Sequence, residues 1–180
     1  RSNLEKGVAK GGDVSCATCH DPARHFADPG KAKSKGTGGT ETTRNAPGLM
    51  DVARNAVFFW DYRATTVEDA ITMHVKEPAT YALADDAALT ARLVALTSAK
   101  GAFAKAFPED KEPVTAANFV KAIGAYVRTL TAPTRFDAFL DGDDDVLNNK
   151  EKRGLKLFTS AFNCMSCHNV DKKVVGPAYK

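Results

Sequence analysis

Apolar side chains recur along most of this chain at the three- and four-residue spacing of an α-helix, and no run alternates convincingly as a β-strand would. The strongest case is residues 115–130, which we expect to form an amphipathic helix capped by Thr115, with Pro133 beyond its end. The pattern therefore predicts an all-α fold. The inward face of this helix would carry Phe119, Ile123, Leu130 and either Tyr126 or Val127.

Two further helices are predicted ahead of that one. The first starts at Thr65 with a Thr-x-x-Glu capping pattern that ends at Glu68, and Pro78 stops it. The second covers residues 85–99. The positions at helical spacing are Val67, Ala70, Ile71 and His74 in the first helix, and Leu89, Leu93 and Leu96 in the second.

The remaining segments are predicted as a leading helix, a long loop, a linker and a last helix. Residues 1–14 would form the leading helix, broken at its glycines. Residues 21–43 show little periodicity, and a loop of that length in a compact domain is usually functional or packed against a ligand. Residues 136–145 are acidic and predicted as a linker, and a helix from about residue 148 then leads to residue 162.

Size and charge exclude several classes of protein. At 180 residues and 43% hydrophobic, the chain can bury one good core or two small ones. A net charge of +3 gives no reason to expect nucleic-acid binding, and no apolar stretch approaches the roughly 20 residues that span a bilayer. The main basic cluster reads most simply as a solvated loop, and alternatively as a docking surface for an acidic redox partner. It consists of Lys31, Lys33 and Lys35.

One short pattern, Cys-x-x-Cys-His, occurs twice and uses all four cysteines of the chain. This pattern is the c-type haem attachment site. Each pair of thiols would add to the vinyl groups of one haem, and the imidazole that follows would bind the iron as the proximal ligand. We therefore expect two covalently bound haems. The first would be held by Cys16, Cys19 and His20, and the second by Cys164, Cys167 and His168.

Zinc binding and disulfide formation are the alternative uses of the cysteines. A single zinc ion shared by both pairs would leave the repeated histidine unexplained. Disulfides within each pair could form in an oxidising compartment. Covalent haem attachment takes place outside the bacterial cytoplasm, and the chain begins at Arg1 without a signal peptide. We therefore expect a mature, exported chain of the periplasm.

Further stretches accompany the two motifs, at residues 15–22 (SCATCHDP), 44–47 (RNAP), 59–64 (FWDYRA), 103–108, 122–123, 128–130, 136–142 and 151–158. Together they resemble the bacterial di-haem cytochrome c peroxidase and MauG family, in its order and over nearly the whole chain. The resemblance implies a cytochrome c-like domain at residues 1–145 with a peroxidatic haem. It also implies the start of a second cytochrome c-like haem domain, truncated, at residues 146–180, whose haem receives electrons.

The resemblance also assigns roles to residues outside the haem motifs. Trp60 stands where a tryptophan between the two haems assists the passage of electrons. Arg44 and Arg63 lie in the matching stretches and are expected to bind the cofactor. Asn45 matches a residue whose carbonyl binds an interdomain calcium ion in the family, which implies a calcium site near Asn45.

Several departures from the family pattern concern the distal face of the first haem. Counted forward from the matching tryptophan, the family's distal Gln, Pro and Glu fall here on Ala70, His74 and Thr80. The carboxylate that assists cleavage of the O–O bond is therefore missing, and Glu77 is the nearest acidic substitute. The glycine of the family's Trp-Asp-Gly-Arg segment is Tyr62.

His74 is accordingly the candidate sixth ligand of the first haem. The ordinary alternative is a half-buried helix histidine that only forms hydrogen bonds. Met73, Met50 and His25 are the other candidate ligands, although His25 follows the first motif too closely to reach the same iron easily. The family's own dissociable histidine lies in a loop, and the corresponding position here is near Thr37.

The C-terminus resembles small class I cytochromes c. There a Gly-Pro carbonyl accepts a hydrogen bond from the proximal histidine, and Pro177 lies at the matching distance from His168. Met165 lies inside the attachment loop and does not easily reach the far face of the haem. The second haem is thus expected to be partly exposed, capped by another chain, or part of a longer protein cut at Lys180.

Three functions follow from these observations. The first, which we favour, is non-catalytic electron transfer on a peroxidase-like scaffold with a closed distal pocket. The second is reduction of hydrogen peroxide, with His74 leaving the iron when the other haem is reduced. The third is a haem subunit of a larger complex. Expected partners are small cytochromes or cupredoxins, and a larger complex or a homodimer that covers the second haem.

Overall fold

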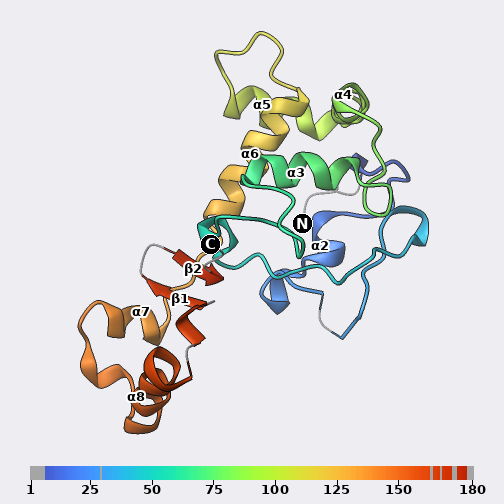
Figure 1. Ribbon diagram of the computed structural model, residues 1–180. Helices are drawn as coiled ribbons and strands as arrows, with labels where there is room; N and C mark the ends of the chain where they lie inside the picture. Colours follow the sequence, from blue (N-terminus) through green and yellow to red (C-terminus); the bar gives the residue numbers. More distant parts are fainter. Residues whose placement is uncertain (1–6, 29, 163, 167, 172–173, 178–180) are drawn as a thin grey trace.

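A computed structural model describes residues 7–28, 30–162, 164–166, 168–171 and 174–177 (Figure 1). The fold of this part of the chain is built from helices, which confirms the all-α class. The helices are α2 (Cys16–Cys19), α3 (Val67–Lys76), α4 (Asp86–Ala95), α5 (Thr97–Ala106), α6 (Ala116–Arg128), α7 (Arg135–Leu140) and α8 (Asn149–Lys156).

Shorter helical segments lie between them. Among the described residues they are η1 (Pro22–Arg24), η2 (Thr37–Gly39), η3 (Val52–Arg54), η4 (Asp144–Val146), η5 (Leu157–Ala161), whose turns are π-helical, and η6 (Cys164–Ser166). No described helix is long and apolar enough to cross a membrane.

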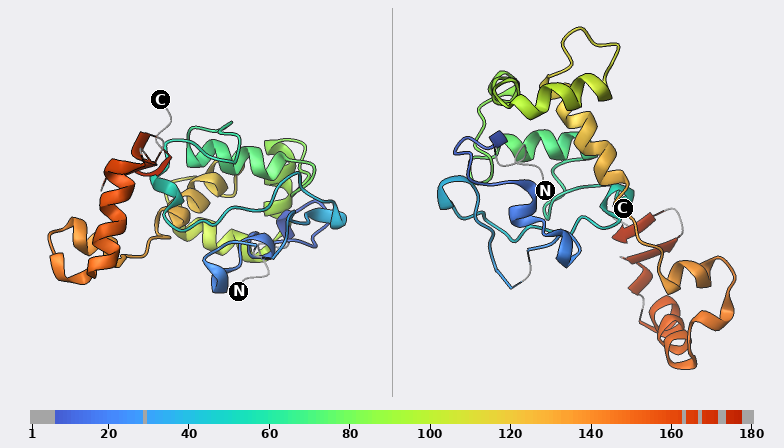
Figure 2. Two further views of the ribbon diagram at one scale, coloured as in Figure 1. Left: turned by 60° about the horizontal axis from the view of Figure 1, so that its bottom comes forward. Right: turned by 180° about the vertical axis from the view of Figure 1, so that it is seen from behind.

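The elements form two lobes (Figures 1 and 2). The larger lobe contains α2 to α6 and the long loops around α2, and the smaller contains α7, α8 and the last described elements. Arg135 of α7 forms a two-pronged ion pair with Glu151 of α8, at 2.9 and 2.8 Å, which fastens the two helices together. The division into domains at residues 1–145 and 146–180 stays a prediction.

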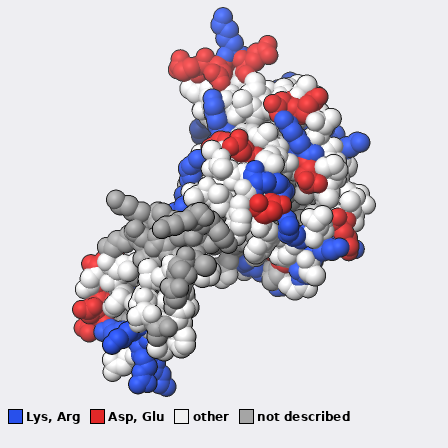
Figure 3. Space-filling view, viewed as in Figure 1, with Lys and Arg blue, Asp and Glu red and all other residues white. Residues whose placement is uncertain are grey.

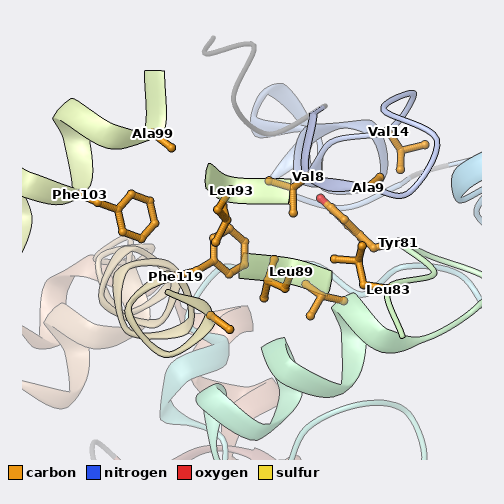
Figure 4. Close-up of a cluster of buried hydrophobic side chains, with 12 residues drawn as sticks. Val8, Ala9, Val14, Tyr81, Leu83, Leu89, Leu93, Ala99, Phe103 and Phe119 are labelled. Carbon is orange, nitrogen blue, oxygen red and sulfur yellow. The ribbon is translucent and has the colours of Figure 1, made fainter. Parts of the chain in front are cut away.

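The core of the larger lobe lies where α3, α4 and α6 meet (Figure 4). Leu89 and Leu93 of α4 are 1% and 0% exposed, and Phe119 of α6 packs in the same cluster. The predicted helix around α6 is confirmed, with Thr115 as its cap. Of the two alternatives for its inward face, Val127 is the buried side chain, and Tyr126 is 53% exposed.

The single helix predicted for residues 85–99 is wrong, because two helices cover this region and the sequence pattern missed the second. Leu96 interrupts them with extended backbone at φ −89° and ψ 105°. Its side chain packs against Gly7, where a Cβ atom would collide with it. Leu96 thus leaves the helix to fill the space beside a residue that has no side chain.

Two other predicted boundaries change. The cap of α3 is Thr66, whose hydroxyl accepts from the Asp69 amide, and not Thr65. The acidic segment predicted as a linker contains α7, because Thr134 and Asp137 form a capping box at its start. The last helix begins as predicted, with Asn148 as its cap.

A short antiparallel hairpin follows the helices, although no strand was predicted. It pairs β1 (His168–Asp171) with β2 (Val174–Pro177), and Pro177 stands opposite His168 in the register. Each strand has four residues, which is too short for alternation to be recognised in the sequence.

The long loop of residues 21–43 is fastened to the body of the protein by buried polar groups. The hydroxyl of Ser34, 1% exposed, accepts a hydrogen bond from the Ala46 amide at 3.0 Å. Gly36 lies so close to the loop after α3 that a Cβ atom would meet the carbonyl oxygen of Ala79. The loop is therefore packed against the body of the protein, and its packing against a ligand stays a prediction.

We expect Gly36→Ala to destabilise the protein by about 1–3 kcal/mol, because the new methyl group collides with backbone that cannot rotate away. The measurement is the denaturant midpoint of the haem-loaded protein. Gly101→Ala is the matched control, because the space around Gly101 in α5 is open. It should stabilise the protein by roughly 0.5–1 kcal/mol, since alanine favours the helix. Equal midpoints for the two variants would contradict this account of the loop.

Candidate haem-binding site

The first Cys-x-x-Cys-His motif forms a single helical turn, α2, followed by His20. The turn is closed by the Ser15 amide, which donates to the Thr18 hydroxyl at 2.9 Å, and by the His20 amide, which donates to the Cys16 carbonyl at 2.8 Å. No disulfide joins the cysteines among the described residues. Burial raises the pKa of the Cys19 thiol, so it is not an activated thiolate.

The sulfur atoms of this turn point to different surroundings. The Cys16 sulfur lies 3.1 Å from the hydroxyl oxygen of Tyr81, a buried side chain from the loop after α3. The Cys19 sulfur lies 3.7 Å from the Lys35 carbonyl oxygen, in the long loop. The two attachment points thus lie beside different segments of the chain.

The His20 ring is oriented by a backbone carbonyl. Its Nδ1 atom lies 3.0 Å from the carbonyl oxygen of Phe26. His25 and Phe26 adopt φ of 55° and 57°, a left-handed conformation that non-glycine residues rarely take, and this turns the chain back toward His20. A hydrogen on Nδ1 leaves Nε2 as the metal-binding nitrogen. Burial lowers the pKa of His20, which favours the neutral imidazole that metals bind.

His74, near the end of α3, faces His20. The centroids of the two rings are 6.2 Å apart, with an angle of 60° between the ring planes. Burial, and then the charges of His20 and Arg63, lower the pKa of His74 to about 4, so this ring is also neutral near pH 7. An imidazole–metal bond is about 2 Å long, as for zinc. The gap therefore has the width for one metal atom bound by a nitrogen of each ring.

Two thiols and two neutral imidazoles form the donor set that a covalently attached haem needs. An apolar cavity adjoins one of the thiols. It has a volume of about 240 Å³, opens beside Cys16 and Tyr81, and is lined mostly by apolar side chains of α5 and α6. The lining includes Phe103, Phe107, Phe119 and Ile123.

The other candidates for a sixth ligand lie elsewhere. The Met73 side chain is 37% exposed, and His25 is exposed on the loop after α2. Met50 lies in the loop before η3. The hydroxyl of Thr37, the position that matches the family's loop histidine, donates to Asp13 at 2.6 Å. Of the predicted ligands, the structure therefore brings His74 to His20.

Thr80 stands at the position where the family resemblance leads us to expect a carboxylate. Its hydroxyl donates to the backbone carbonyls of His74 and Glu77. These bonds fasten the end of α3 to the following loop. Thr80 thus has a structural role there, and its hydroxyl is directed at the helix end rather than at a substrate. Glu77 caps α3, and its carbonyl also accepts from the Thr80 and Ala82 amides.

Arg44 and Arg63 meet at one carboxylate, which the sequence did not single out. Asp61 accepts from both guanidinium groups at 2.8 Å, and these hydrogen bonds lower its pKa to about 2. Arg63 also lies over the ring of Phe59, 3.7 Å from its centroid. Asp61 therefore holds together two arginines from different segments, Arg63 on the loop that follows Phe58 and Arg44 on the loop before η3.

Trp60 projects from the same loop, with 57% of its surface exposed. Its Nε1 atom donates to the carbonyl oxygen of Asn45 at 2.9 Å. The side-chain Nδ2 atom of Asn45 in turn donates to the backbone carbonyls of Asp28 and Lys31, both at 2.7 Å. The residues predicted for electron passage and for calcium are thus joined by one hydrogen bond. Among the described residues, no cluster of three His, Cys, Asp or Glu side chains could hold a metal ion.

The second motif is described only in part. Cys167 lies outside the described residues, and of Pro177 only the backbone is described. The Cys164 sulfur lies 3.8 Å from the Phe162 carbonyl oxygen, and the exposed His168 ring packs near Phe158, with centroids 6.3 Å apart. The neighbouring Phe162 side chain is 70% exposed.

Three residues of the site were missed by sequence reasoning. Phe26 contributes only its backbone carbonyl group, and no pattern of side chains in the sequence predicts such a contact. Tyr81 lies in an irregular loop, where periodicity gives no direction for a side chain. Asp61 was recognisable in principle, since it lies between aromatic residues and beside Arg63 in a stretch that resembles the family.

Comparisons with known proteins identify the family of this chain. A family model described as di-haem cytochrome c peroxidase matches residues 4–145. The cytochrome c551 peroxidase of Pseudomonas aeruginosa is 34% identical over 87% of this chain and 44% of its own length. The methylamine utilization protein MauG of Methylorubrum extorquens is 31% identical over 90% of this chain and 45% of its own.

Solved structures show the same likeness. A MauG-like protein associated with microbial copper homeostasis superposes with a TM-score of 0.79 and 28% identity, over 98% of this chain and 53% of that one. The di-haem peroxidase BthA of Burkholderia thailandensis gives 0.72 and 27%, over 94% and 49%. The chain spans about half the length of the curated relatives it matches. It belongs to the di-haem cytochrome c peroxidase family.

Proposed function

We propose that this chain is part of a di-haem c-type oxidoreductase that reduces hydrogen peroxide, with Cys16, Cys19 and His20 holding the first haem. The facing pair of His20 and His74 beside the attachment turn supports a haem at this place, and membership of the di-haem cytochrome c peroxidase family carries the proposed reaction. The names of the relatives, which include cytochrome c peroxidases, support the reaction. A bound haem supplies an iron atom that can exchange electrons and bind small oxygen compounds.

The protein's own residues set the conditions for that chemistry. The Phe26 carbonyl orients His20 and increases its basicity, which strengthens it as a ligand. His74 occupies the place that peroxide would need, so its ring has to move away before peroxide can approach. The apolar walls formed by α5 and α6 limit water in the site.

Electron transfer without peroxide chemistry is the second candidate, and it was the function favoured by the sequence. The 6.2 Å separation of the histidine rings favours it, because two axial histidines leave no open position. So does the absence of a carboxylate at the position of Thr80, which uses its hydroxyl at the end of α3. The comparisons support peroxide reduction better, since relatives are named as peroxidases.

The remaining assignments concern the second haem and the surroundings of both. Cys164, Cys167 and His168 would hold the second haem, in keeping with the di-haem family, and the Pro177 carbonyl would accept from His168. Pro177 stands opposite His168 in the register of the hairpin, which is compatible with a hydrogen bond from His168 to the Pro177 carbonyl. Trp60 would assist electrons between the haems.

We also propose a calcium site, redox partners and a location for this protein. Calcium would bind near Asn45, whose carbonyl oxygen has a second lone pair beyond the one used by Trp60. Electron donors would be small cytochromes or cupredoxins of the periplasm, and a larger complex or a second copy would cover the exposed second motif. Positive and negative side chains are interspersed on the face of the larger lobe seen in Figure 3, which favours a partner of mixed charge.

The first experiment is electron paramagnetic resonance of the oxidised and half-reduced protein, with His74→Ala and with Met73→Ala as the neighbouring control. We expect the first haem to be low-spin in the oxidised wild type and in Met73→Ala, and high-spin in His74→Ala. If half-reduction makes it high-spin in the wild type and peroxide is then consumed, peroxide reduction is supported.

The same spectra can reject each proposal. A first haem that stays low-spin after half-reduction, in a protein that consumes no peroxide, would favour electron transfer instead. A spectrum of His74→Ala that matches the wild type would show that His74 is not the ligand.

Arg44 and Arg63 are proposed to bind the carboxylate groups of the first haem, with Asp61 holding the two guanidinium groups together. The Asp61 pKa is lowered to about 2, so the stability that its ionised form contributes is present above the ordinary aspartate pKa of about 3.9. It is lost as the pH falls through about 2.

We therefore expect Asp61→Asn to lower the denaturant midpoint at pH 7 and to matter progressively less as the pH falls from about 4 toward 2. The measurement is the midpoint of both proteins across this range. The same substitution in a protein that already carries Arg44→Gln and Arg63→Gln should have no pH-dependent effect. An equal effect at all pH values would show that the carboxylate is not acting through the arginines.

A further inference from the structure

Tyr81 joins the two sides of the candidate haem site. Its side chain is 4% exposed and lies among the buried residues of the larger lobe, beside Ala9 and Leu83 (Figure 4). Its hydroxyl oxygen is 3.1 Å from the Cys16 sulfur. Its ring also packs against the His74 ring, with centroids 5.9 Å apart and an angle of 62°. One side chain thus touches both an attachment point and the candidate sixth ligand.

The backbone around Tyr81 is fixed from two directions. The Tyr81 carbonyl accepts from the Lys10 amide at 2.9 Å, and the Thr80 carbonyl accepts from the Thr37 amide at 2.8 Å. The first bond reaches the segment before α2 and the second reaches the long loop. The backbone of Tyr81 and its neighbour Thr80 is thus tied to both of these segments.

The chemistry of attachment decides the direction of the hydrogen bond. A free thiol can donate or accept, but a cysteine sulfur joined to a vinyl carbon has no hydrogen left. The Tyr81 hydroxyl must then be the donor, and a thioether sulfur is a weak acceptor. Donation withdraws electron density from a sulfur on the edge of the macrocycle, and hydrogen bonding around a haem is one of the means by which a protein tunes its reduction potential.

We propose that Tyr81 is a positioning residue of the first haem, which donates its hydroxyl hydrogen to the Cys16 sulfur and supports the ring of His74. The proposal rests on the first haem and its axial histidines as proposed above. The hydroxyl favours the reduced state of this haem through the sulfur. The ring slows the departure of His74, so one residue influences both the potential and the opening of the iron.

Two substitutions separate these effects in the haem-loaded protein. Tyr81→Phe removes the hydroxyl and keeps the ring. It should lower the potential of the first haem, shifting its reduction equilibrium toward the oxidised state roughly two- to tenfold, the range of one ordinary hydrogen bond. Tyr81→Leu removes the ring as well, and should in addition raise the rate of carbon monoxide binding to the reduced haem. The measurements are spectroelectrochemical titration and stopped-flow mixing.

Tyr126→Phe is the matched control, since Tyr126 is 53% exposed and packs on Phe26 away from Cys16. It should leave both quantities at the wild-type values. A potential in Tyr81→Phe equal to that of the control would overturn the role of the hydroxyl, even if Tyr81→Leu fails to fold. A carbon monoxide rate in folded Tyr81→Leu equal to the wild type would overturn the role of the ring.

The test of Tyr81 can succeed or fail independently of the proposed peroxide reduction. The potential of the Tyr81→Phe variant depends on the Cys16 sulfur and not on peroxide turnover. A shifted potential in a protein that consumes no peroxide would therefore support the role of the Tyr81 hydroxyl while rejecting peroxide reduction. An unshifted potential in a protein that consumes peroxide would reject the role of the hydroxyl alone.

Discussion

The approach of two histidine rings to within 6.2 Å is the constraint on which the larger lobe depends. His20 belongs to the attachment turn and His74 to the end of α3, so the long loop between these elements has to fold back on itself. The interaction between two neutral imidazoles does not by itself favour an arrangement in which they face each other across such a gap. Their arrangement makes physical sense when a metal atom between them binds both, which is why the haem and the fold are best understood together.

Much of the larger lobe can be understood as support for that pair. The hydrophobic contacts of α3 with α6 are reinforced by Glu68 and Arg128, which form a two-pronged ion pair at 2.7 and 3.0 Å. Gly124 leaves the space that this pair needs on the surface of α6. The exposed ion pair contributes modestly to stability, yet it sets how α3 lies on α6 and hence where His74 stands.

The sequence predicted the elements that depend on local rules and missed those that depend on distant partners. The helix around Phe119 and the attachment turn follow from periodicity and from a motif whose chemistry fixes its spacing. The break at Leu96 could not be foreseen, because it depends on Gly7 in a remote segment. His74 was found through the family resemblance, whereas Tyr81 was missed because only the folded loop directs it toward Cys16.

The turn at His25 and Phe26 has a consequence for how this site tolerates change. The group that receives the His20 hydrogen belongs to the main chain, so it is present whatever side chain occupies position 26. What varies with the residue is the ease of adopting a positive φ, which asparagine or glycine would accept more readily than phenylalanine. The basicity of the proximal histidine is therefore encoded in backbone shape, and it can persist while the residues around it diverge.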